Sequence, residues 1–170
     1  MYGSPQLLLD TIQGKISSEK VSDLTVAATR SWSDAYFGDF SYDASLDFLE
    51  VTKDWLGVLV KLQIPTRSDV GFRECLKNAK AVWDKPDYWS QLFHASIVDD
   101  LLELKNSSWN DSSEPISEDE FVSRLQLRSI LVRENGAFEV CYDDGQLFGG
   151  HEIVLDGFLD DGISNVALHG

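Results

Sequence analysis

The sequence predicts an α+β protein, in which a central helical segment packs on one face of a mainly antiparallel sheet. Apolar residues alternate with a period of two in the flanking parts of the chain, at 40–64 and 127–169, which is typical of half-buried strands. Between these parts they recur every three or four residues, as on a helix with one buried side. With 43% hydrophobic residues in a chain of 170, a single domain with a buried core is expected.

The first part of the sheet is expected between residues 40 and 64. The segments are 40–42, 46–48 and 55–64, and the turns between them are 43–45 and 52–54. In the last segment the residues that share one face are Leu56, Val58, Val60, Leu62 and Ile64. Leu59 breaks this alternation, and Pro65 ends the strand. Nearer the N-terminus, a helix over 5–22 and a strand over 24–28 are expected.

Two long helices and one short helix are expected in the middle of the chain. The first is capped by Thr66 or Ser68 and runs to about Trp83, and the second has Asp84 as its N-cap and Pro86 in its first turn. Their apolar stripes are Phe72, Leu76, Ala79 and Trp83, and then Trp89, Leu92, Phe93, Ile97, Leu101 and Leu104. A polar loop is expected over 106–115. The short helix starts at a capping box, Ser117 to Glu120, flanked by Ile116 and Phe121 as a hydrophobic staple.

The remaining strands of the sheet are expected after residue 126. Their ranges are 127–133, 137–142, 151–159 and 163–169. Asn135-Gly136 suits a tight primed turn, whereas Asp144-Gly145 and Asp161-Gly162 supply the residues with positive φ that other reversals require.

The net charge of the chain limits its partners. Twenty-nine acidic and 14 basic residues give a formal net charge of -15. Nucleic acid and anionic membranes are not expected as direct partners, because both attract clustered Lys and Arg. No stretch approaches the roughly 20 apolar residues of a membrane helix. Since no export signal is visible either, a cytoplasmic protein is expected.

The negative charge is concentrated in residues 134–170, which contain eight acidic residues and no Lys or Arg. The candidates for contact with a basic partner are Asp143, Asp144, Glu152, Asp156, Asp160 and Asp161. In the strand after His151, Glu152 and Asp156 alternate with Ile153 and Leu155, which predicts one buried face and one mixed acidic and apolar face. The alternative is a solvated face that keeps the protein soluble.

No catalytic residue is assigned from motifs. The common phosphate-binding, metalloprotease and nucleophile motifs are missing from the sequence, and no cluster has the spacing of a zinc or calcium site, so neither a metal nor another cofactor is expected. An acid–base role is considered for His151, with Asp143 or Asp144 as its partner. The structural alternative is that Gly149-Gly150 allows a sharp entry to the strand, and that the imidazole bonds a neighbouring backbone group.

Other residues with distinctive chemistry are interpreted as structural. His94 is expected to be a partly buried side chain with one hydrogen-bond partner, and His169 to be solvated or at a sheet edge. Cys75 and Cys141 match no metal or redox spacing and are expected to be reduced. The tryptophans are interpreted mainly as packing residues rather than as a carbohydrate-stacking surface. They are Trp32, Trp55, Trp83, Trp89 and Trp109.

Several segments together resemble the bacterial domain of unknown function 2262 family. They are 106–109 (NSSW), 116–121 (ISEDEF), 125–130 (LQLRSI) and 142–153 (YDDGQLFGGHEI), with the terminal Gly170, the segment 40–43 and the strand from Trp55. The Phe-x-Gly-His element at 148–151 is the most specific of these. The resemblance covers residues 37–170 and leaves 1–36 as an N-terminal extension. It implies a fold and no catalytic residues.

The function expected from charge and resemblance is binding rather than catalysis. Small acidic cytosolic bacterial proteins of this kind are often immunity proteins, which neutralise toxins delivered by competing cells. By this analogy, the partner is a cognate protein toxin, expected to be basic, whose active or substrate-binding site is blocked by the acidic residues. The alternatives are a small enzyme that uses His151 with Asp143 or Asp144, and a general protein-interaction module.

Overall fold

One sheet contains all the strands that are described. The computed structural model describes residues 32–65, 68–109 and 114–170, and residues 33–170 form one compact unit. The strands are β1 (Trp32–Asp34), β2 (Gly38–Asp43), β3 (Phe48–Trp55), β4 (Val58–Ile64), β5 (Gln126–Val132), β6 (Ala137–Asp143), β7 (Glu152–Phe158) and β8 (Gly162–His169). Their order in the sheet is the same as their order in the chain. The helix and strand expected at 5–22 and 24–28 lie outside the described residues.

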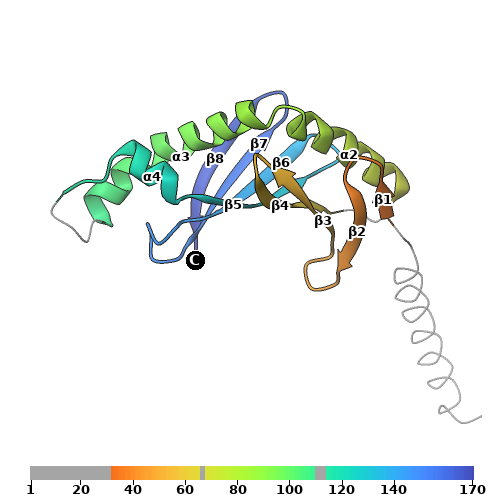
Figure 1. Cartoon of the computed structure of the whole chain (residues 1–170), viewed down its shortest axis with the longest axis horizontal. Helices are drawn as coiled ribbons and strands as arrows, with labels where there is room; N and C mark the ends of the chain where they lie inside the picture. Colours follow the sequence, from red (N-terminus) through yellow and green to blue (C-terminus); the bar gives the residue numbers. More distant parts are fainter. Residues whose placement is uncertain (1–31, 66–67, 110–113) are drawn as a thin grey trace, which may run out of the picture. The chain divides into compact units, whose positions relative to one another are not determined.

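The helices connect the two halves of the sheet. In the part of the chain that the structure describes, the helices are α2 (Asp69–Trp83), α3 (Pro86–Ser108) and α4 (Glu118–Arg124), and these three lie between β4 and β5 in the chain. Strands β4 and β5 are parallel neighbours, so the chain has to return from one end of the sheet to the other between them. The other pairs with a described register are antiparallel. Figure 1 shows α2 and α3 along one face of the sheet. A mainly antiparallel sheet with a central helical segment is therefore observed.

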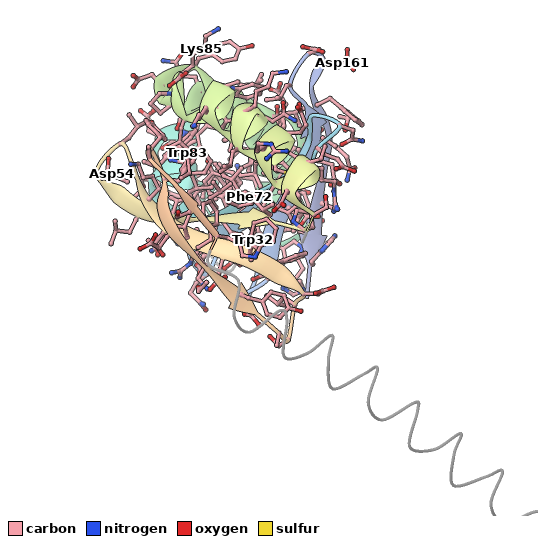
Figure 2. All side chains as sticks on the ribbon, turned by 90° about the vertical axis from the view of Figure 1, so that its right-hand side faces the viewer. Trp32, Asp54, Phe72, Trp83, Lys85 and Asp161 are labelled. Atoms are coloured by element: carbon pink, nitrogen blue, oxygen red, sulfur yellow. The ribbon has the colours of Figure 1, made fainter. Side chains whose placement is uncertain are left out.

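Helix α2 begins and packs as its sequence predicts. The Ser68 hydroxyl accepts a hydrogen bond from the backbone N–H of Gly71 over 3.0 Å, which caps the helix. All four predicted stripe residues are buried. Figure 2 shows Phe72 and Trp83 between the helix and the strands, and the Trp83 indole donates to the carbonyl oxygen of Asp54 over 3.2 Å.

The prediction of Asp84 as the N-cap of α3 is wrong. Asp84 ends α2, where its backbone N–H bonds the carbonyl oxygen of Lys80, and the residue before α3 is Lys85, which makes no side-chain cap. Pro86 does occupy the first turn, where its missing N–H costs no helical hydrogen bond.

Helix α3 is longer than predicted, because residues 106–108 are helical rather than part of a loop. Polar side chains at this end satisfy backbone groups. Lys105 donates to the carbonyl oxygen of Trp109, and the Asn106 amide accepts from the Ile116 N–H over 2.9 Å and donates to the Ile116 carbonyl over 3.2 Å. The buried stripe ends at Leu101, and Leu104 is exposed.

The short helix α4 begins at the predicted cap. The Ser117 hydroxyl accepts from the Glu120 N–H over 3.2 Å, and Phe121 is fully buried. The second bond of a capping box is not formed in the described part of the chain, since the Glu120 carboxylate instead bonds Arg124 at 2.5 Å. The predicted partner of Phe121, Ile116, is half-buried.

The predicted position of the turn between β3 and β4 is wrong. The turn lies at Leu56-Gly57 rather than at 52–54, and both residues have positive φ, 53° and 87°. This is a two-residue primed turn, in which Leu56 occupies a backbone region that leucine rarely adopts. The predicted segment 55–64 is thus the end of one strand, a turn and the whole of the next strand.

The C-terminal strands agree with the prediction to within about one residue, but one turn differs. At Asn135-Gly136 only Gly136 has positive φ, 81°, and its N–H bonds the carbonyl of Arg133, so the loop is a longer reversal rather than a primed turn. Gly145 and Gly162 have the predicted positive φ values, 56° and 82°.

The core lies between the sheet and the helices. The ring of Trp55 contacts that of Trp83 directly, and Phe93 links Trp55 to Trp89. These three tryptophans are buried as predicted, whereas Trp109 is partly exposed. Both cysteines are free thiols. Burial is the main cause that raises the pKa of Cys75 to about 11 and that of Cys141 to about 12, so both thiols are protonated at neutral pH.

Candidate functional site

The sheet face opposite the helices carries a row of side chains that crosses seven strands. We call this face the open face. Residues that are partners in register point to the same side of a sheet. The row reads Ser41, Glu50, Gln63, Leu131, Glu139, Asp156 and Asn165. The sequence predicts the inward and outward sides of β7 correctly, because Ile153 and Leu155 are fully buried on the helix side.

The open face has an apolar centre with charges around it. Leu131 and Val154 are buried there, and Cys141 and Ala167 are partners of Val154 in register. Glu50 is paired with Lys61 at 3.3 Å, and the Asp156 carboxylate accepts from the Asn165 amide over 3.2 Å. Because Leu131 and Val154 are already covered within the fold, the surface that the open face offers to a partner comes from the polar and charged side chains around them.

Two of the predicted contact residues lie together at one end of this face. Asp143 and Glu152 are partners in register, and the Arg128 guanidinium bonds the Asp143 carboxylate at 2.7 Å. This hydrogen bond, followed by the one from the Gly145 N–H, lowers the pKa of Asp143 below its usual value. Asp143 therefore stays ionised in mildly acid solution, and Arg128 neutralises part of its charge.

The last two predicted residues, Asp160 and Asp161, lie at the opposite end of β7. They form the turn between β7 and β8, and Figure 2 shows Asp161 at its tip. Six residue steps separate Glu152 from Phe158 along this strand, which is about 20 Å at the usual rise per residue. The predicted acidic residues thus do not form one compact cluster.

The prediction that Asp144 contacts a partner is wrong. Its side chain is 1% exposed, and its carboxylate accepts three backbone N–H groups of the loop that follows. The donors are Gln146 at 3.0 Å, Phe148 at 2.7 Å and Gly150 at 3.1 Å. A short aspartate that binds its own loop in this way fixes the loop's conformation. The carboxylate that made Asp144 a candidate for binding a basic partner instead binds backbone N–H groups of its own chain.

The surroundings of His151 agree with a structural role rather than with acid–base chemistry. Gly149 and Gly150 both have positive φ, 72° and 89°, and the Nδ1–H of His151 donates to the Phe148 carbonyl over 2.5 Å. Its ring packs edge-on against Trp109, with centroids 5.3 Å apart. Within the described residues, neither Asp143 nor Asp144 bonds the imidazole. The structure does not bring His151 and these two aspartates into the hydrogen-bonded arrangement that acid–base catalysis needs.

A cavity of about 430 Å³ lies elsewhere, and we call it the Tyr142 cavity. It is lined by the β3–β4 turn, one side of α3 and the beginning of β5, together with Tyr142 of β6. His94 and Ser90 line it from α3, and Arg128 lines it from β5. The Arg128–Asp143 ion pair thus connects the cavity with the acidic end of the open face.

The Tyr142 hydroxyl has no hydrogen-bond partner among the described residues, although the side chain is 2% exposed. Every fully enclosed side-chain oxygen or nitrogen in the described part does have a partner. The Tyr142 hydroxyl is therefore accessible to solvent or a ligand from the cavity. Burial raises the pKa of Tyr142 well above its usual range, so it remains a neutral phenol.

His94 is the second polar group of the cavity without a hydrogen bond in the described part, which corrects the expectation of one partner. Its ring lies 5.9 Å from that of Tyr142, measured between centroids. Burial lowers its pKa, so the imidazole is neutral at pH 7 and presents one donor and one acceptor.

Comparison with known families shows the family of the chain. A model of the family DUF2262, described as an uncharacterized protein conserved in bacteria, matches residues 34–168. The chain belongs to this family. The DUF2262 match includes strands β2 to β7, β8 up to Leu168, and the helices α2, α3 and α4. It also contains the Phe148–His151 element, whose contacts here are structural. Searches of curated proteins and of solved structures gave no match.

No group of three or more His, Cys, Asp or Glu side chains within residues 32–65, 68–109 and 114–170 is placed to hold a metal ion. In the same ranges, no helix combines the length and apolar character of a membrane span.

The sequence reasoning missed the Tyr142 cavity. One signal was present, because Leu59 breaks the alternation of β4 and is 75% exposed in the structure. Leu56 and Val58, at the same hairpin tip, are each 52% exposed. An aliphatic cluster at a hairpin tip indicates a contact surface.

Proposed function

We propose that this protein is a non-enzymatic, cytoplasmic immunity protein, which binds a cognate basic toxin and blocks its active or substrate-binding site. The observation that carries the proposal is the open face, where Glu139, Glu152 and Asp156 lie on the same side of β6 and β7 in a chain of net charge -15. Opposite fields speed the encounter of two proteins toward about 10⁸ M⁻¹s⁻¹ at low salt. Fast capture is useful to a protein that must intercept a toxin within its own cell.

The acidic end of β6 and β7 is the part of the open face expected to contact the toxin. Glu152 is exposed, and Asp156 is half-buried on the same strand. Their carboxylates would bind Lys and Arg side chains of the toxin. Asp144 contributes only by holding the loop in place.

Co-expression with the product of the adjacent upstream gene is the first test. We expect growth rescue and co-purification of the two proteins. The triple variant Asp143→Asn, Glu152→Lys and Asp156→Lys should stay folded, because none of these side chains is in the core. It should associate at least about tenfold more slowly at low salt, with a weaker salt dependence.

The matched control changes charge elsewhere on the molecule. Glu74→Lys with Glu103→Lys alters two exposed helical positions away from the open face, and it adds as much positive charge as the two lysines of the test variant. We expect wild-type protection from this control. If the test variant remains folded, protects fully and associates at the wild-type rate at low salt, the acidic surface is a solubility feature and the proposal fails.

A further inference from the structure

The Tyr142 cavity presents polar groups that its own fold leaves unsatisfied. A buried hydroxyl without a partner forgoes a bond that water or a ligand can make. Tyr142 offers such a hydroxyl, and His94 offers one donor and one acceptor close by. Ser90 accepts from the Trp55 indole over 2.9 Å, so its own hydroxyl hydrogen is available as well. The cavity therefore fits a group that both donates and accepts.

The charge of the cavity favours a neutral occupant. Its inner polar groups, Tyr142, His94 and Ser90, are all uncharged at pH 7. Arg128 is already bonded to Asp143 at 2.7 Å. A buried anion or cation would lack a free counter-charge, and an unpaired buried charge is costly.

The walls favour an aromatic body. Apolar side chains of Val58, Leu125 and Leu127 surround the polar groups, and the volume of about 430 Å³ lies within the usual range of ligand sites. A flat ring with one polar end can bury its faces against these walls and direct a hydroxyl or ring N–H toward Tyr142.

The rim favours a protein as the source of this ring. Leu56 and Leu59 are exposed at the mouth, and a small molecule within the cavity would leave much of their surface in water. A protein surface that inserts one side chain would cover them. Rigid aromatic side chains in a central pocket, with apolar contacts around them, are the usual anchors of protein interfaces.

We infer that the Tyr142 cavity is the anchor pocket for a protein partner, and that it takes a tyrosine or tryptophan side chain. The polar end of this side chain bonds Tyr142 and His94, and the partner's surface covers Leu56 and Leu59. The inference rests on the proposed function only in assigning the ring to a protein partner; the chemistry of the pocket stands independently.

The pocket chemistry is tested with side-chain analogues on the full chain. The probes are 4-methylphenol for tyrosine, 3-methylindole for tryptophan and toluene for phenylalanine, and NMR titration follows the ring signals of Tyr142 and His94. We expect saturable millimolar binding of the first two, competition between them, and at least about fivefold weaker binding of toluene. Failure of 4-methylphenol to saturate, or equal affinity for toluene, would overturn the inference.

A conservative variant isolates the hydroxyl. Tyr142→Phe removes a group without a described partner, so the fold should be unaffected, and 4-methylphenol should then bind no better than toluene. Leu46→Ala, at the exposed tip of the other hairpin, is the control and should leave all three affinities unchanged. Unchanged 4-methylphenol affinity in Tyr142→Phe would also overturn the inference.

The source of the ring is tested with Leu59→Ser. This change lies at the rim, so it should leave the affinity for 4-methylphenol unchanged but weaken binding of the co-expressed upstream product about tenfold. If that product binds and Leu59→Ser and Tyr142→Phe both leave its affinity unchanged, the protein assignment is wrong. If it does not bind at all, the proposed function fails, while the probe titrations still decide the chemistry of the pocket.

Discussion

The Nδ1–H of His151 donates a hydrogen bond to the carbonyl oxygen of Phe148 over 2.5 Å, and this bond joins the start of β7 to the loop that Asp144 organises. We expect His151→Ala to lower the free energy of unfolding by about 1 to 2 kcal/mol, because the bond and the contact with Trp109 are both lost. Urea titration measures the change. His169→Ala, at an exposed position, is the control and should cost within about 0.5 kcal/mol. An equal effect of the two variants would contradict a structural role for His151.

The start of α4 allows a cap and a core residue to be compared. Phe121→Ala should cost about 3 to 5 kcal/mol, because Phe121 is fully buried and packs against Phe148 with ring centroids 6.1 Å apart. Ser117→Ala removes only the capping bond to Glu120 and should cost about 1 kcal/mol. Urea titrations of both variants give the order, and the reverse order would mean that the helix is not held by its buried face.

Gly145 combines a positive φ with a close approach of backbone. A β-carbon there would lie 2.2 Å from the carbonyl oxygen of Arg124, and φ is 56°. Gly145→Ala should therefore cost more than about 3 kcal/mol, since a backbone atom cannot give way cheaply. Gly38→Ala is the matched control, because φ is 91° there but nothing lies within 4 Å of the added carbon. Thermal unfolding compares the two, and similar losses would show that the approach of Gly145 to the end of α4 is loose.

His94 should make stability depend on pH just below neutrality. Burial lowers its folded pKa below the usual value of 6.5, so the unfolded chain binds the proton more readily. The contribution is fully present above pH 6.5 and is lost as the pH falls from there toward the folded pKa. Between pH 7.5 and 5.5, wild type should lose more stability in urea titrations than His94→Gln, by less than about 1.4 kcal/mol per pH unit. His169→Gln, which changes an exposed side chain, should behave as wild type; if His94→Gln does so as well, the prediction is wrong.

Local signals predicted most of the fold. The four C-terminal strands and the cap of α2 follow from alternation, from glycines with positive φ and from the serine at position 68. The failures occur where long-range packing overrides local preference. Leu56 adopts a positive φ because β3 and β4 remain paired as far as Trp55, which leaves only two residues for the turn. The pattern of apolar residues in the sequence does not indicate this conformation or its energetic cost. Asn106 is helical because its amide bonds Ile116 across the loop.

The candidate site was predicted less well, because charge in a sequence does not distinguish a surface carboxylate from one used inside the fold. Asp143 and Asp144 are neighbours of the same type. One is bonded to Arg128 at the surface and the other is enclosed by three backbone N–H groups. The Tyr142 cavity assembles residues from four separate parts of the chain, so no motif could indicate it.

The order of the strands has a consequence during synthesis of the chain. Strand β4 is complete at Ile64, but its parallel neighbour β5 begins only at Gln126, after α2, α3 and α4. At about 5 to 20 residues per second, the edge of β4 waits roughly 3 to 12 s for its partner. An apolar strand with an open edge is prone to pair with other chains. Lys61, in the middle of β4, puts a charged side chain on that strand, and a charge within an apolar strand disfavours pairing of this kind.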